Sequence, residues 1–104
     1  MRVELLYFDG CPSYERLLPR LRDLVAASNA GVEVELRRVE SIEDAERERF
    51  LGSPTVRVDG VDVDPTASRR EDFGLKCRLY RAGEGTTPLP PDEWIREALA
   101  ESER

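Results

Sequence analysis

The chain has 104 residues, enough for one compact domain and too few for two separate cores. Its net charge is −6 and its basic residues are mixed among acidic ones, so no basic stripe is present and nucleic acid is excluded as an expected partner. Histidine is absent, which excludes Ser-His and Cys-His catalysis as well as imidazole metal ligands.

The sequence also indicates in which cellular compartment the protein is expected. No stretch approaches the roughly 18 apolar residues that a membrane span needs, and residues 1–10 lack the basic start and apolar middle of a signal peptide. We therefore expect a soluble, cytoplasmic protein that does not insert into a membrane. Cys11 and Cys77, the two cysteines, would normally be reduced there, so a persistent structural disulfide is not the expected state.

The first half of the chain predicts alternating strands and helices. Residues 3–8 form an almost continuous apolar run, which is typical of a central strand covered on both faces. Apolar residues then recur at helical spacing over residues 12–27, with Pro12 in the first turn of the predicted helix. Residues 32–36 alternate between apolar and polar, which predicts a second strand.

A short helix and a hairpin are expected next. Ser41 followed by Asp44 predicts the capped start of a mostly charged helix over residues 42–49. An Asp-Gly pair in the middle of residues 56–63 predicts a tight β-hairpin. Four carboxylates near it lack the spacing of an EF-hand and are interpreted as a solvated edge: Asp59, Asp62, Asp64 and Asp72.

Residues 65–90 carry the weakest signals. Alternation over residues 75–79 favours a short strand, and the glycines and prolines that follow favour a loop. Two positions are open for Cys77: buried between its leucine neighbours, or folded back over the first strand-to-helix turn. A last helix is predicted over residues 91–99, because acidic residues stand at its start and apolar residues follow at helical spacing.

Three motifs now stand out in this order of elements. Cys11-Pro12-Ser13-Tyr14 follows the first strand, Ser53-Pro54-Thr55 precedes the hairpin, and Pro19 lies inside the first helix. They resemble, respectively, the C-x-x-C motif, the cis-proline loop and the helix-bending proline of the thioredoxin-like superfamily. The chain is most similar to small bacterial members of it, some of which are associated with organomercurial lyases.

This resemblance implies an α/β, thioredoxin-like fold with a small mixed sheet flanked by helices in the order βαβαββα. The domain would span residues 1–104, and residues 65–90 would be an insertion before the last helix that carries Cys77. A cis Ser53-Pro54 bond would expose backbone beside Cys11, on which an extended thiol substrate could lie as an added strand.

The chemistry centres on Cys11. Unpaired backbone N–H groups and the helix dipole favour negative charge at a helix start, and the thiolate is the nucleophilic form of cysteine. Tyr14, one turn along, could offer its hydroxyl to the thiolate. The alternative is that Cys11 packs as a small apolar residue and that Tyr14 is an ordinary aromatic at the edge of the core.

We therefore expect thiol–disulfide exchange in which Cys11 attacks and Cys77, or an external thiol, resolves the mixed disulfide, since Tyr14 replaces the second cysteine. The candidate catalytic residues are Cys11 and Cys77, and the candidate substrate-binding residues are Pro12, Tyr14, Ser53, Pro54 and Thr55. The expected partner is a protein or low-molecular-weight thiol or disulfide, with no cofactor and no resident metal.

Two alternatives stay open. Both cysteines together would suit a soft cation such as Cu(I) or mercury. A redox-inert module could instead bind a partner through its cis-proline face. A separation of more than about 7 Å between the Cα atoms of Cys11 and Cys77 would exclude a disulfide and a two-thiolate metal site without movement of the backbone.

Overall fold

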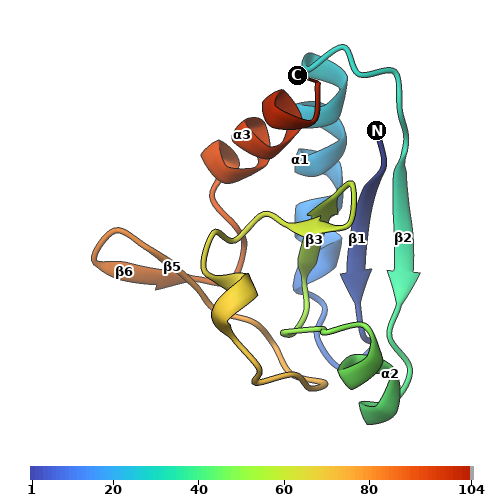
Figure 1. Ribbon diagram of the computed structural model, residues 1–104, viewed down its shortest axis with the longest axis vertical. Helices are drawn as coiled ribbons and strands as arrows, with labels where there is room; N and C mark the ends of the chain where they lie inside the picture. Colours follow the sequence, from blue (N-terminus) through green and yellow to red (C-terminus); the bar gives the residue numbers. More distant parts are fainter. Residues whose placement is uncertain (104) are drawn as a thin grey trace.

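The computed structural model describes residues 1–103 and shows a mixed α/β chain (Figure 1). The main sheet contains four strands in the spatial order β2-β1-β3-β4, and β5 and β6 form a separate ribbon. The strands of the sheet are β1 (Val3–Tyr7), β2 (Val34–Arg38), β3 (Thr55–Val58) and β4 (Val61–Asp62). The α-helices are α1 (Ser13–Ala27), α2 (Ile42–Arg47) and α3 (Asp92–Ser102). No helix within residues 1–103 is both long and apolar enough to cross a membrane.

β1 is an interior strand, as its continuous apolar run predicts. It pairs in parallel with β2 and antiparallel with β3, and β3 continues antiparallel into β4. Alternate residues of β1 enter two different cores. Val3 and Leu5 pack with the buried faces of α1 and α3, whereas Leu6 packs with Ala45 of α2 and with Phe50. The sheet therefore has α1 and α3 on one face and α2 on the other.

Two predicted boundaries shift for identifiable reasons. The second strand begins at Val34, two residues later than predicted, because Val34 pairs with Val3 at the start of β1. The second helix ends at Arg47, earlier than predicted, because Arg49 adopts a positive φ of 55° and Phe50 N–H then donates to the Ala45 carbonyl. This is the Schellman pattern of helix termination. The predicted cap at the helix start is confirmed, since the Ser41 side chain accepts from Asp44 N–H.

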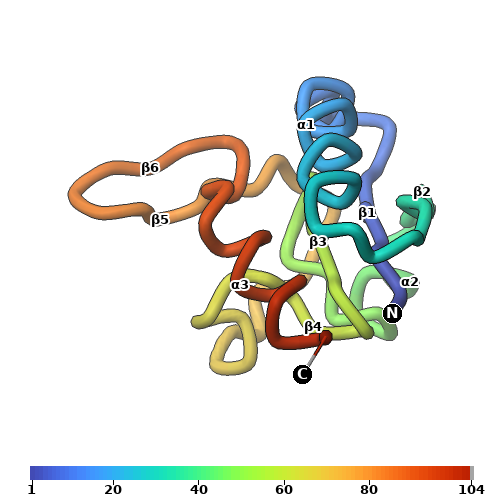
Figure 2. The backbone as a smooth tube through the Cα atoms, turned by 90° about the horizontal axis from the view of Figure 1, so that it is seen from above, coloured from blue at the N-terminus to red at the C-terminus, as the bar shows by residue number. Residues whose placement is uncertain are grey.

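Residues 65–90 differ most from the prediction. After a 3₁₀ turn (Ala67–Arg69), the chain passes beside Ser53, just before β3. It then forms an antiparallel ribbon of β5 (Tyr80–Ala82) and β6 (Gly85–Thr87), which projects from the body of the protein (Figure 2). The predicted loop is thus partly a hairpin, turned at Gly83, whose φ of 62° suits glycine. The predicted strand over residues 75–79 is wrong, because only Cys77 pairs there, through a single bridge to Ser53.

Candidate functional site

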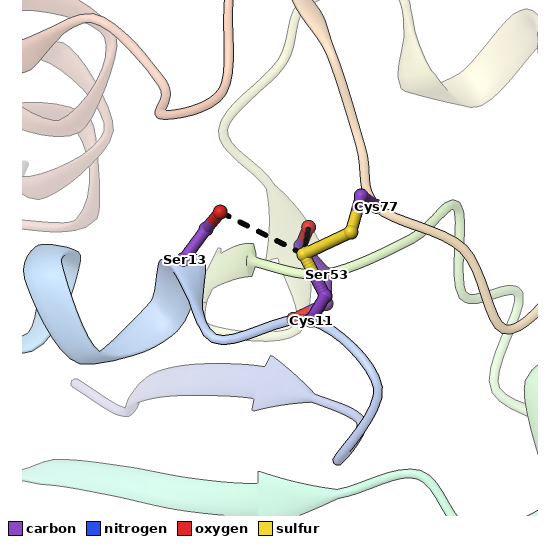
Figure 3. Close-up of a disulfide and its surroundings, with 4 residues drawn as sticks. All are labelled: Cys11, Ser13, Ser53 and Cys77. Atoms are coloured by element: carbon purple, nitrogen blue, oxygen red, sulfur yellow. Dashed lines mark hydrogen bonds between the residues drawn. A yellow bond between two sulfur atoms is a disulfide. The ribbon is translucent and has the colours of Figure 1, made fainter.

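A disulfide joins Cys11, just before α1, to Cys77 in the long segment between β4 and β5 (Figure 3). Their Cα atoms lie 5.6 Å apart although 66 positions separate them in sequence. This separation is ordinary for a disulfide. A persistent disulfide is not the state expected from the sequence, whereas in this structure the two cysteines are bonded to each other. Of the two positions left open for Cys77, the structure shows the fold-back.

Backbone hydrogen bonds hold Cys77 in place. Ser53 N–H donates to the Lys76 carbonyl at 2.8 Å, and Arg78 N–H donates to the Ser53 carbonyl at 2.9 Å. Ser53 and Cys77 thus pair in parallel. Gly52 permits this approach: its φ is 125°, and a Cβ there would lie 2.9 Å from the Lys76 carbonyl oxygen. The disulfide is therefore set into a short stretch of sheet-like backbone pairing.

This pairing corrects the expectation of a substrate-binding backbone at the cis-proline loop. The Ser53-Pro54 bond is cis, as predicted. Ser53, Pro54 and Thr55 are all buried, however, and both backbone hydrogen-bonding groups of Ser53 are used by residues 76–78. The place of an added substrate strand beside Cys11 is already filled by the chain itself.

The surroundings of Cys11 contain groups that favour each of its protonation states. In the disulfide its sulfur carries no hydrogen, so the Ser13 hydroxyl, 3.6 Å away, is the donor to it. Pro12 occupies the N-cap of α1 without a side-chain cap, which leaves the first-turn amides of Ser13 and Tyr14 without helical partners. The Ser53 carbonyl lies 3.7 Å from the sulfur and can accept only from a protonated thiol.

The remaining two predicted site residues lie beside the disulfide without bonding to it. Pro12 is exposed at the surface. The Tyr14 ring stacks on Tyr7 of β1, with ring centroids 4.0 Å apart. The hydroxyl that reaches Cys11 belongs to Ser13, so the predicted role of Tyr14 as donor is wrong and its alternative, an aromatic at the core edge, holds.

Next to Cys77, the buried side chain of Arg78 ties the segment to the sheet. Its guanidinium pairs with Asp62 at 2.8 Å and with Asp64 at 3.2 Å, and donates to Thr55 Oγ1 at 2.9 Å. Its side chain is 0% exposed. The interpretation of Asp62 and Asp64 as a solvated edge is therefore wrong, because they neutralise a buried charge.

The electrostatics of this cluster favour ionised Asp64. Burial acts to raise the pKa of Asp64, but two hydrogen bonds from Thr66 and the nearby charge of Arg78 outweigh it and hold that pKa below its ordinary value. Asp64 therefore stays anionic at neutral pH, which keeps Arg78 paired. The cluster stabilises the segment that carries Cys77.

Tyr80 fastens the same segment to the cis-proline loop. Its ring is fully buried beneath the Arg78 guanidinium, 4.4 Å from it, and its hydroxyl donates to the Pro54 carbonyl. Burial raises the pKa of Tyr80 well above its ordinary value, so the hydroxyl remains a donor. Arg78 and Tyr80 thus face inward while Cys77 and Leu79 are exposed, so the alternative that buried Cys77 between its leucine neighbours is wrong.

Sequence reasoning missed two residues, Ser13 and Arg78. Ser13 could have been found, since a hydroxyl two residues after a helix-start cysteine lies within reach of the thiol. Arg78 offered no such signal, because a charged residue in an alternating stretch is normally assigned to the exposed face.

The chain matches no protein-family model, and it shows no significant similarity to a curated protein or to a solved structure. What the site can do must therefore be inferred from its own geometry. Within residues 1–103, no group of three or more potential His, Cys, Asp or Glu ligands is placed to hold a metal ion.

Proposed function

We propose that this protein has a thioredoxin-like fold and exchanges thiols and disulfides through the Cys11–Cys77 pair. One observation carries the proposal: a disulfide has one of its sulfurs directly before the uncapped N-terminus of a 15-residue helix. The order of elements, with β1, α1 and β2 followed by α2, the β3–β4 hairpin and α3, supports the fold assignment.

The chemistry is a two-step exchange. A thiolate RS⁻ attacks one sulfur of the disulfide, forms a mixed disulfide and releases the other cysteine as a thiolate. A second RS⁻ then attacks the R sulfur of the mixed disulfide, which releases RSSR and the second cysteine. Two thiols are oxidised and one disulfide is reduced, and the protons lost by the two RSH molecules are available to the two cysteines.

The expected partner is a protein or low-molecular-weight thiol or disulfide, and the reaction uses no cofactor. Cys77 serves as the intramolecular partner that position 14 does not provide. In a cytoplasmic setting, glutathione-type thiols would reduce the pair and oxidised substrates would restore it.

A second candidate function uses the same pair in its reduced form. The 5.6 Å separation of the Cα atoms would let two thiolates hold a two-coordinate soft cation such as Cu(I) or mercury. The redox-inert module is disfavoured, because the cis-proline face through which it would bind is filled by residues 76–78.

The proposal predicts an acidic titration of Cys11 in the reduced protein. The free amides of the first turn of α1 and the Ser13 hydroxyl stabilise the thiolate, so its ultraviolet absorbance should appear with a midpoint below ~8.5, the ordinary value for cysteine. Cys77→Ser assigns the signal to Cys11, and Ser13→Ala should raise the midpoint. A midpoint at or above ~8.5 in Cys77→Ser would contradict an activated thiol.

A further inference from the structure

We infer that external thiols attack the sulfur of Cys77 and that Cys11 is the leaving thiolate, so that the mixed disulfide forms on Cys77. This inference rests on the proposed exchange function and states which of the two cysteines reacts with the external thiol. It reverses the prediction made from the C-x-x-C-like motif, in which Cys11 meets the substrate.

Access to the two cysteines is unequal. Cys11 is 1% exposed, buried among the start of α1, the Ser53 loop and Cys77. Cys77 is exposed, and so are Leu79 and Arg81 at the next alternate positions, of which Arg81 lies within β5. An incoming thiolate therefore meets Cys77 first.

The direction of attack adds to this difference. Exchange requires the incoming sulfur to approach along the line of the S–S bond, from behind the sulfur that it attacks. Behind Cys11 that approach is restricted: Ser13 Oγ lies 3.6 Å from the sulfur and the Ser53 carbonyl oxygen 3.7 Å, and Figure 3 shows Ser13 on the side of Cys11 away from Cys77.

Leaving-group chemistry points the same way. The thiol that is the stronger acid leaves faster in exchange. Cys11 adjoins the positive end of α1 and accepts from Ser13, whereas Cys77 lies in an extended segment outside any helix. The inference requires that the helix end and Ser13 outweigh the burial of Cys11 and the Ser53 carbonyl 3.7 Å away. Attack on Cys77 then expels the better-stabilised thiolate.

The step balances without a further reactant. The low-molecular-weight thiolate RS⁻ bonds to Cys77 Sγ, the S–S bond breaks, and its electron pair stays on Cys11 Sγ. In the oxidising direction Cys77 attacks a substrate disulfide RSSR and releases RS⁻, and Cys11 then attacks Cys77 Sγ and releases a second RS⁻. Cys11 is thus the leaving thiolate when the protein disulfide is reduced and the resolving thiol when it is formed again.

The test uses the oxidised wild-type chain and reduced glutathione as probe. The reaction is quenched with acid after short times, free thiols are alkylated with a maleimide, and peptides are mapped by mass spectrometry. Early glutathione adducts are expected on Cys77, with the maleimide on Cys11, in at least about tenfold excess over the converse pattern.

Adducts that appear first on Cys11 would overturn this order while leaving the exchange function intact. A native chain that forms no adduct at all would contradict the exchange function itself, so the two failures are distinguishable. The matched variants Cys11→Ser and Cys77→Ser, treated with glutathione disulfide, provide the second measurement: Cys11→Ser is expected to react at least about tenfold faster. Equal rates, or a faster Cys77→Ser reaction in a folded chain, would overturn the order.

Discussion

Replacing Cys77 with serine is expected to lower the free energy of unfolding by about 4 kcal/mol relative to the oxidised chain. The disulfide closes a loop across 66 positions, and a cross-link of that span removes much of the conformational entropy of the unfolded state. Such a change is a large fraction of the stability of a small domain. Denaturant unfolding followed by circular dichroism measures it.

The wild-type chain in its reduced form is the control for this prediction. It should show nearly the same loss as Cys77→Ser, because both lack the cross-link while residues 76 and 78 keep their hydrogen bonds to Ser53. A Cys77→Ser variant as stable as the oxidised chain would contradict the contribution assigned to the disulfide.

The second large effect is expected at Arg78. Arg78→Ala should cost about 3–5 kcal/mol, because Asp62 and Asp64 would lose the buried cation that pairs with them. Arg78→Lys should recover only part of this loss, since an ammonium cannot reproduce the two-nitrogen contact with Asp62 and the contact with Asp64. Thermal or denaturant unfolding of the oxidised proteins gives the comparison.

Arg81 provides a matched control three positions along the same segment. It is exposed, so Arg81→Ala should change the free energy of unfolding by no more than about 0.5 kcal/mol. If Arg78→Ala were as mild as Arg81→Ala, the cluster of Arg78 with its two aspartates would not be what fastens residues 76–80 to the sheet.

The disulfide at Cys77 and the ion pairs of Arg78 lie at adjacent residues, and this bears on the proposed function. The Arg78 ion pairs and the Ser53 backbone bonds do not involve the sulfur atoms, so we expect them to hold Cys77 near Cys11 when the disulfide is reduced. A thiol held close to its partner has a high effective concentration, which favours rapid closure of the bond. The proposed function therefore predicts that this segment opens and recloses one bond without unfolding.

The parts of the fold that depend on local pattern could be predicted from the sequence. The apolar run of β1, the Asp-Gly turn and the Ser41 cap all follow from short stretches of residues, whereas the cis Ser53-Pro54 bond follows from the resemblance to the thioredoxin-like cis-proline loop. The position of Cys11 before a helix follows from the same kind of signal.

The parts that depend on long-range pairing could not. Cys77 lies across from Ser53 because of backbone hydrogen bonds between segments over 20 residues apart. The alternation in residues 75–79 does not indicate which residue of another segment each of them pairs with. The same alternation left open a Cys77 buried between Leu75 and Leu79, whereas Arg78 and Tyr80 are the buried residues. Arg78 turns inward only because Asp62 and Asp64 neutralise it, and that compensation is invisible until the hairpin and the later segment are placed together.

Reduction of the disulfide in the folded chain tests the central claim most directly. The oxidised protein is treated with a small thiol over a series of denaturant concentrations well below the unfolding transition. If exchange occurs through an exposed Cys77, the rate of reduction should be proportional to the thiolate concentration and nearly independent of denaturant. Glutathione disulfide should re-form the protein disulfide. A rate that rises steeply with denaturant and equals the rate of global unfolding would show a purely structural disulfide and contradict the proposed function.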